Sequence, residues 1–96
     1  MRVEYHPAVA QDLAEALRYY SSISERLEAE FEGEVRRKIA AAAAQPGRFH
    51  LLKPGLHRAN LERFPYHFLY RELEDGIRVT LVRHHRRRPD LGLERE

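Results

Sequence analysis

Cysteine is absent from the 96-residue chain, and serine occurs only three times. Without cysteine, disulfide bonds and thiolate chemistry are excluded. Ser21, Ser22 and Ser24 all lie in the short segment "YYSSIS", where helix capping is enough to account for them. Because the chain also has no Gly-x-Ser-x-Gly elbow, acyl transfer by a serine nucleophile is not supported.

Long apolar runs and glycine-rich loops are missing as well. No run approaches the roughly 18 apolar residues that a membrane-spanning helix needs, and the opening "MRVEYHPAVAQD" lacks the apolar core of a secretory signal. We therefore expect a cytoplasmic protein without membrane contact. No glycine-rich loop is suited to a nucleotide, so no cofactor is expected.

Histidine is plentiful by contrast, and its spacing bears on metal binding. The six histidines are His6, His50, His57, His67, His84 and His85. They include no His-x-x-His pair and no pair at helical i,i+4 spacing, and no cysteine is present to complete a site. The adjacent His84 and His85 would point to opposite faces of a strand. We therefore expect no metal site.

Charge is unevenly distributed along the chain, although the net charge is only +2. Residues 1–47 hold six Arg or Lys and eight Asp or Glu, a net charge of −2, whereas residues 48–96 hold eleven and seven, a net charge of +4. The densest basic run is "RHHRRRP" at residues 83–89. This asymmetry indicates an anionic partner for the second half of the chain.

The composition and the hydrophobic patterns predict one small domain over residues 1–96. We expect a strand over 1–6, a helical hairpin over 7–45, antiparallel strands over 56–88 and a tail over 89–96. This β-α-α-β-β-β order predicts an α+β fold, in which the hairpin packs on one face of a mostly antiparallel four-stranded sheet. The segment "RFHLLKPG", which precedes the antiparallel strands, is expected to be irregular.

Polar residues of the predicted helices are expected to face solvent or to cap helix ends. Asp12 falls on the wet side of the first helix. Ser22 begins a Ser-x-x-Glu capping box for the second helix. Carboxylates of the second helix are expected to form a solvated face with i,i+4 partners, such as Glu34 with Lys38.

Alternation assigns the two faces of the strands. One aromatic set occurs at two-residue steps and is expected to pack on the helices: Phe64, Tyr66, Phe68 and Tyr70. The intervening residues would form the other, partly apolar face: His67, Leu69, Arg71 and Leu73. A single-layer sheet would leave Leu69 and Leu73 open, which suggests that a partner covers this face.

The last predicted strand, "IRVTLV", follows a hairpin turn and leads into the basic run. Asp75 and Gly76 are typical of a two-residue hairpin turn. Arg78 and Arg83 differ by an odd step, which predicts that they lie on opposite faces of the sheet. The arginines at the end of this strand are suited to phosphate groups or, equally well, to a carboxylate-rich segment of a partner.

Five segments, in order along almost the whole chain, resemble ParE-type toxins of the RelE/ParE superfamily. They are "YHP" (5–7), "ALRYY" (16–20), "QPGRFH" (45–50), "LERFPYHFLYR" (61–71) and "VRHHRRRP" (82–89). The resemblance implies the toxin of a type II toxin–antitoxin pair, with roles in growth arrest and plasmid stabilisation. It implies a cognate antitoxin that wraps and neutralises the toxin, with DNA contacted only through the antitoxin.

The resemblance leaves two kinds of target open. ParE members poison DNA gyrase, whereas RelE members cut messenger RNA in the ribosome. Arg63, His84, Arg86 and Arg87 would serve the nuclease alternative, but no tyrosine or tryptophan follows Tyr70 to assist a nucleotide. We therefore expect a ParE-like inhibitor without catalysis of its own. A third alternative is a non-toxic module that only binds an antitoxin.

The residues expected to contact the target or the antitoxin gather mainly at the basic run. They are Arg58, Arg63, Arg83, His84, Arg86, Arg87 and Arg88. His85 and Arg88 depart from the family pattern, which often has Gly or Ser and Asp at these places. Leu91 or Leu93 stands where an aromatic residue often follows the proline.

Overall fold

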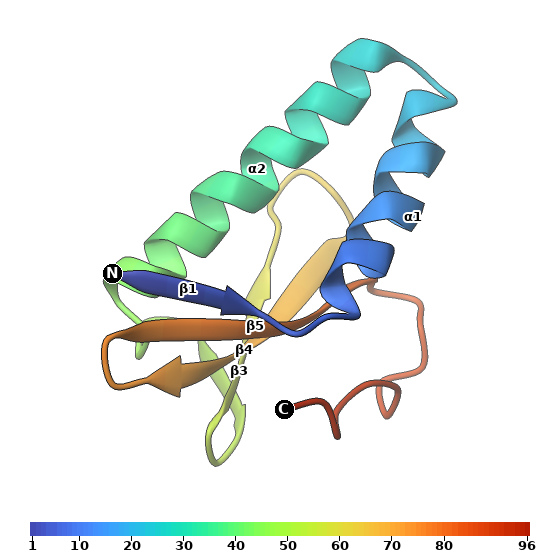
Figure 1. Ribbon diagram of the computed structural model, residues 1–96. Coiled ribbons are helices and arrows are strands. Elements are labelled where there is room, and N and C mark those ends of the chain that lie inside the picture. Colours follow the sequence, from blue (N-terminus) through green and yellow to red (C-terminus); the bar gives the residue numbers. More distant parts are fainter.

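The computed structural model describes all residues from Met1 to Glu96 as two helices and five strands. In chain order they are β1 (Arg2–Tyr5), α1 (Val9–Ser21), α2 (Glu25–Ala44), β2 (His50–Lys53), β3 (Leu56–Asn60), β4 (Tyr66–Leu73) and β5 (Gly76–His84). Figure 1 shows the two helices as a hairpin over one face of the sheet, with the C-terminal segment running back beneath the strands.

The sheet has the strand order β1-β5-β4-β3-β2, so the first and last strands of the chain are neighbours. β1 runs parallel to β5, and every other pair is antiparallel. The predicted α+β architecture with its helical hairpin is confirmed. The sheet is mixed, because the parallel neighbours β1 and β5 are joined by a long connection that includes both helices, whereas the remaining strands are joined by shorter loops.

The sheet has one strand more than the four predicted. β2 forms in the segment that was expected to be irregular, and it pairs antiparallel with β3 through the turn at Pro54 and Gly55. All four β2 residues are exposed, so the strand shows no buried stripe that a pattern search would detect. Its pairing is carried by main-chain groups, and Gly55 allows the tight turn with a φ of +79°.

The helical hairpin packs on the face of the sheet that carries the alternating aromatics, as predicted. Phe64, Phe68 and Tyr70 belong to the main core, and Tyr66 packs against its edge. Phe31 of α2 is fully buried among them, with its ring 5.3 Å from that of Phe64 and 5.0 Å from that of Tyr66. These edge-on aromatic contacts fix α2 against the start of β4.

The cap of α2 differs from the predicted one. Ser24, not Ser22, is the N-cap, and its hydroxyl accepts a hydrogen bond from the Leu27 N–H at 3.0 Å. Ser22 instead ends α1, and its hydroxyl donates to the Tyr19 carbonyl at 2.6 Å. The predicted box fails because the turn between the helices extends two residues further than expected.

A β-bulge at Thr80 corrects the predicted faces of β5. Leu69 pairs with Leu81, but Tyr70 pairs with Val79, so Thr80 is an extra residue opposite β4. One inserted residue shifts the alternation of side chains by one position. Two residues of β5 that lie on opposite sides of the bulge and differ by an odd step therefore point to the same face of the sheet. Arg78 and Arg83 therefore lie on the same face, the one away from the helices, and the prediction of opposite faces was wrong.

The face of the sheet away from the helices is not open, which corrects a second expectation. Leu69 is fully buried in a small cluster with Leu56 and Leu81, and Leu93 of the C-terminal segment packs on this cluster. Leu73, which was also expected to be open, is half-buried. The chain therefore supplies its own cover for this face.

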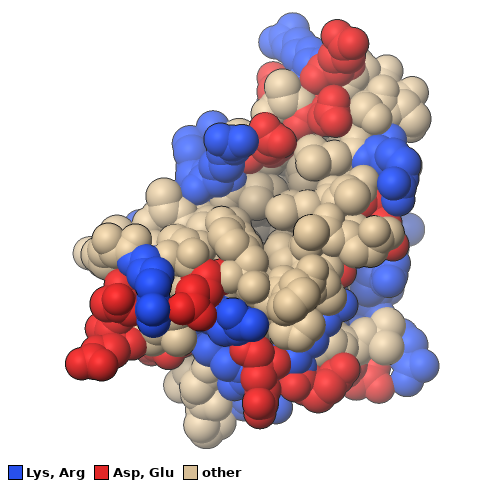
Figure 2. All heavy atoms as spheres, viewed as in Figure 1, with Lys and Arg blue, Asp and Glu red and all other residues tan.

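An apolar groove of about 410 Å³ remains at the surface between β1 and the two helices. Val3 and Tyr5 of β1 face Leu17 of α1 and Ile39 of α2 across it. Figure 2 shows this hollow as an uncharged area bordered by charged side chains of both signs. Neither helix has the length and hydropathy that a bilayer-crossing segment requires.

Candidate functional site

Arg83 is the most buried member of the basic run, with 7% of its surface exposed. Its guanidinium donates to the carbonyl oxygens of Arg88 at 2.9 Å, Leu91 at 2.7 Å and Pro89 at 3.2 Å. Its Nε also donates to His67 Nε2 at 2.9 Å. Arg83 therefore holds the chain that follows β5 against the sheet, and it presents little surface to a partner.

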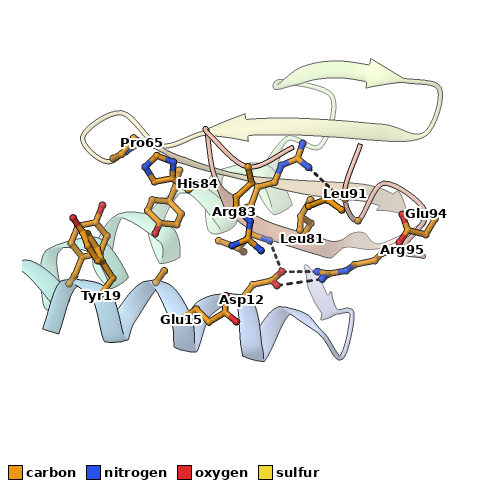
Figure 3. A pocket seen from close by; sticks show the side chains of 16 residues that line it. Asp12, Glu15, Tyr19, Pro65, Leu81, Arg83, His84, Leu91, Glu94 and Arg95 are labelled. Atoms are coloured by element: carbon orange, nitrogen blue, oxygen red, sulfur yellow. Dashed lines mark hydrogen bonds and ion pairs between the residues drawn. The ribbon is translucent and has the colours of Figure 1, made fainter. Parts of the chain in front are cut away.

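Asp12 is the second anchor of this region, and the prediction that it faces solvent was wrong. Its carboxylate accepts the Val82 N–H at 3.1 Å, a group beside the bulge. It also pairs with Arg95 at 2.7 Å, and Arg95 donates to the Thr80 carbonyl at 3.2 Å. α1, β5 and the C-terminal segment therefore meet at this one carboxylate (Figure 3).

Two hydrogen-bonded imidazoles, those of His67 and His85, connect Arg83 to the surface. His67 Nδ1 and His85 Nδ1 lie 2.9 Å apart, and the two rings stack at 5.1 Å with an angle of 12°. Because Arg83 can only donate, His67 Nε2 must accept, and its proton lies on Nδ1. His67 then donates to His85 Nδ1, which leaves the His85 proton on Nε2. Arg58 lies at 3.5 Å from the same His85 nitrogen.

Burial and nearby cations keep both of these imidazoles neutral. Burial is the main cause that lowers the pKa of His67 to about 3, with Arg58 and Arg83 adding repulsion. Burial followed by Arg58 also lowers the pKa of His85. Neutral rings are required by the hydrogen bonds, since a doubly protonated ring has no acceptor left for Arg83 or His67.

The lowered pKa of His67 predicts loss of stability in acid. Above pH 6.5 the ring is neutral in both the folded and unfolded chain, so its contribution is fully present. Below pH 6.5 the unfolded chain binds a proton that the folded chain does not, and stability falls until the folded pKa near 3. At pH 5 the expected loss from His67 alone is about 2 kcal/mol.

Urea unfolding of the wild type and of His67→Gln at pH 7 and pH 5 measures this loss. Glutamine can still accept from Arg83 but does not titrate, so its acid-dependent loss should be smaller by about 2 kcal/mol. His50→Gln, on the exposed edge strand β2, is the matched control and should keep the full loss. Equal losses in the wild type and His67→Gln would show that His67 does not carry the effect.

The exposed part of the basic run is short. Arg86, Arg87 and Arg88 are exposed, and of these only Arg88 pairs with a carboxylate, that of Asp90 at 3.0 Å. His84 is half-buried, with its ring edge-on to Tyr66 at 5.1 Å and its Nδ1 accepting the Arg86 N–H at 3.0 Å. Arg86 and Arg87 are thus exposed cations without a carboxylate partner, and Arg87 lines a cavity together with Tyr66 and His84.

Arg63 and Arg58 come from outside the run at the end of β5, and only Arg63 lies apart from it. Arg63 pairs with Glu30 of α2 at 3.0 Å and lies over the Phe64 ring. The hydrogen bond to Glu30 is the main cause that raises the pKa of Arg63. Arg58 donates to Asn60 at 2.8 Å on the sheet face away from the helices. The structure therefore separates Arg63 from the rest of the predicted basic set, whereas Arg58 lies 3.5 Å from His85.

A cavity of about 780 Å³ lies where α1, the end of β5 and the C-terminal segment meet. Tyr19, Tyr20 and Tyr66 line it together with His84 and Arg87 (Figure 3). Burial is the main cause that raises the pKa of both Tyr20 and Tyr66. These phenols stay protonated near neutrality and can act as hydrogen-bond donors.

Sequence reasoning did not point to several residues that shape this region. Tyr19, Asp12 and Arg95 come from segments far from β5, and no local pattern links them to it. The structure holds no group of three or more His, Cys, Asp or Glu side chains able to bind a metal ion.

Comparison with known proteins places the chain in a family and finds solved structures with the same fold. A family model described as "ParE toxin of type II toxin-antitoxin system, parDE" matches residues 3–89. The chain belongs to the ParE toxin family. A solved structure described as "Chromosomal ParDE TA system from P. aeruginosa" shares the fold with a TM-score of 0.73 and 18% sequence identity. The match covers 88% of this chain and 95% of the other. No curated protein matches.

The family match does not include the C-terminal end of this ParE-family chain. It includes the whole helical hairpin, all of the five strands except Arg2, and Arg86, Arg87 and Arg88, and it stops at Pro89. Most of the C-terminal segment, including Leu93 and Arg95, therefore lies outside the matched region. That segment is nevertheless packed on the sheet.

Proposed function

We propose that this ParE-family chain is the toxin of a type II toxin–antitoxin pair. In this proposal it acts in the cytoplasm, arrests growth by binding DNA gyrase, and is neutralised by a cognate antitoxin. The family match supports the toxin assignment. The observation that carries the binding role is a pair of exposed cations without carboxylate partners, Arg86 and Arg87, of which Arg87 lines one cavity with Tyr66 and His84. Tyrosine and arginine are the residues that most often dominate protein–protein binding energy.

The geometry supports binding rather than catalysis by this chain. RNA cleavage needs a base, an acid and cations directed at one phosphate. Arg63 is paired with Glu30 on α2, and the imidazoles of His67 and His85 are bonded to each other. Of the groups proposed for cleavage, Arg63 is thus held apart from the cavity that His84 and Arg87 line.

A supercoiling assay tests the gyrase target. Gyrase acting on relaxed plasmid should be inhibited by an excess of the purified chain, and Arg86→Ala with Arg87→Ala should weaken inhibition by roughly 10-fold or more. Arg36→Ala is the matched control, since it removes an exposed arginine of α2 with a weak i,i+4 partner. Absence of both inhibition and stabilised DNA cleavage at high excess would refute a gyrase target.

One observation favours the nuclease alternative. Tyr66, His84 and Arg87 line the same cavity, and together they offer a phenol, an imidazole and a guanidinium. A ribosome-dependent nuclease would cleave transcripts in a translation extract and lose this activity in Arg63→Ala or Arg87→Ala. A non-toxic antitoxin-binding module would instead give no growth arrest on expression.

A further inference from the structure

The sheet face away from the helices carries a band of leucines flanked by arginines, which we name the leucine–arginine strip. It consists of Leu56, Leu69, Leu81, Arg71, Arg78 and Arg83. The three leucines touch one another and are 4% exposed or less. The bulge at Thr80 brings Arg78 and Arg83 onto this face, so the strip exists only because of it.

Residues 89–96 cover the strip mainly with main-chain oxygens. Leu93 packs on the leucines. Arg71 donates to the Arg95 carbonyl at 3.3 and 3.4 Å, and Arg78 donates to the Glu96 oxygen at 2.6 Å. Arg83 bonds the carbonyls of residues 88, 89 and 91.

The strip is short of negative charge in this arrangement. Arg71 and Arg83 have no carboxylate partner, and Arg78 has only Glu4 at 3.3 Å. The carboxylate of Asp90 is turned to Arg88 instead. Burial and the nearby Arg58 lower the pKa of Arg83, as expected for an under-compensated cation. A hydrogen bond from a guanidinium to a carboxylate is roughly twice as strong as one between neutral groups.

We propose that the leucine–arginine strip is the docking surface for an acidic, leucine-bearing segment of a partner protein, which displaces residues 89–96. Such a segment would fill the place of Leu93 with its own leucine and give Arg71 and Arg83 the carboxylates that they lack. The docking presupposes the antitoxin partner of the proposed function. Residues 89–96 then act as an internal competitor that covers the leucines until the partner binds.

The way residues 89–96 are held makes this exchange feasible. Few hydrogen bonds lie within the segment, and its attachment depends on the arginines of the strip and on Arg95. Arg95 bridges to Asp12 and Thr80, neither of which belongs to the strip. Weakening this bridge should free the strip more often, and apparent affinity for a competitor rises in proportion to the freed fraction.

Fluorescence anisotropy with a defined probe tests the proposal. The probe is the labelled peptide Glu-Asp-Leu-Gly-Leu-Glu-Asp-Glu, and its neutral match is Gln-Asn-Leu-Gly-Leu-Gln-Asn-Gln. The acidic probe should bind the intact chain, and Arg95→Gln should bind it about 10-fold tighter. The neutral peptide should bind at least about 10-fold more weakly than the acidic one. Arg26→Gln, an exposed α2 arginine, is the matched control and should leave the affinity unchanged.

A second variant and a second measurement also test the displacement of residues 89–96. Leu93→Ala replaces Arg95→Gln if that variant fails to fold, and it should likewise tighten binding. Amide hydrogen exchange of residues 90–96 in the intact chain should speed up when the acidic probe is added. Lack of probe binding by both loosened variants, or equal binding of the two peptides, would overturn the proposal. Neither peptide binding nor hydrogen exchange involves gyrase or growth. A negative result in these measurements would therefore overturn the docking proposal without refuting the proposed function.

Discussion

Replacing Gly76 with alanine is expected to lower the free energy of unfolding by about 3 kcal/mol or more. Gly76 begins β5 and lies opposite Arg2 of the parallel strand β1. A Cβ at this position would overlap the Arg2 carbonyl oxygen and lie 2.7 Å from its carbonyl carbon. These are main-chain atoms in a hydrogen-bonded strand, so they cannot rotate away as a side chain does.

The main cost should fall on β1. The strand is attached through Arg2, whose N–H donates to the Asp75 carbonyl at 2.9 Å, and through His6, whose N–H donates to Val79 at 2.8 Å. Displacing it would also expose Val3, which packs against the core. The loss corresponds to a Tm lower by roughly 12 °C or more for a domain of this size.

Gly47→Ala is the matched control for this substitution. A Cβ at Gly47 would meet nothing within 4 Å, and the residue has no positive φ. Its effect should therefore lie within about 1 kcal/mol, on the stabilising side if anything. Chemical denaturation of both variants compares them directly. A Gly76→Ala protein as stable as Gly47→Ala would contradict the close approach of β1.

Replacing Glu34 with alanine is expected to cost about 3 kcal/mol. Glu34 lies on α2 but is only 6% exposed, and the prediction of a solvated pair with Lys38 was wrong. Its carboxylate accepts the N–H groups of Glu62 at 2.6 Å and Arg63 at 3.2 Å. Lys38 pairs with Glu62 instead, at 2.7 Å. Alanine would leave two N–H groups without their charged acceptor, and hydrogen bonds to charged groups contribute about 1.5–3 kcal/mol each.

Glu32→Ala is the matched control on the same helix. Glu32 is exposed and pairs only with Arg36 at 3.4 Å, so its removal should cost about 0.5 kcal/mol or less. Glu34→Gln should fall between the two, because its amide oxygen accepts hydrogen bonds without the charge. Thermal or urea unfolding measures the series. Equal effects of Glu32→Ala and Glu34→Ala would show that the carboxylate does not hold the loop.

The carboxylate of Glu34 also has a link to the candidate site. The loop that it fixes, residues 61–65, carries Arg63 and ends at Pro65, whose carbonyl accepts the His85 N–H at 2.9 Å. Loosening this loop should therefore disturb the end of β5, from which Arg86 and Arg87 project.

Hairpin prediction illustrates how far local signals reach. The sequence predicted a tight turn between two strands, and β4 and β5 do form a hairpin. However, Leu73 pairs with Gly76, so the turn residues are Glu74 and Asp75. Gly76 is in the strand without a positive φ, and its glycine is required by β1 rather than by the turn. The requirement comes from a segment about 70 residues away, which no local pattern records.

The candidate site shows the same division. The sequence identified the basic run at the end of the last strand, and Arg86, Arg87 and Arg88 of this run are exposed. It gave no sign that Arg83 is used internally, because burial of an arginine depends on carbonyl groups that only the folded C-terminal segment brings to it. Nor did it separate Arg63, which is drawn to α2 by Glu30.

By itself, the sequence determined the helical hairpin, the aromatic face of β4 and the order of elements, because each follows from a hydrophobic period within one segment. Only the tertiary structure decided the pairing of β1 with β5, the contacts of Asp12 with β5 and Arg95, the burial of Glu34, and the shared face of Arg78 and Arg83. These features depend on main-chain contacts between distant segments and on one inserted residue that reverses side-chain alternation. Neither effect leaves a periodic trace in the sequence.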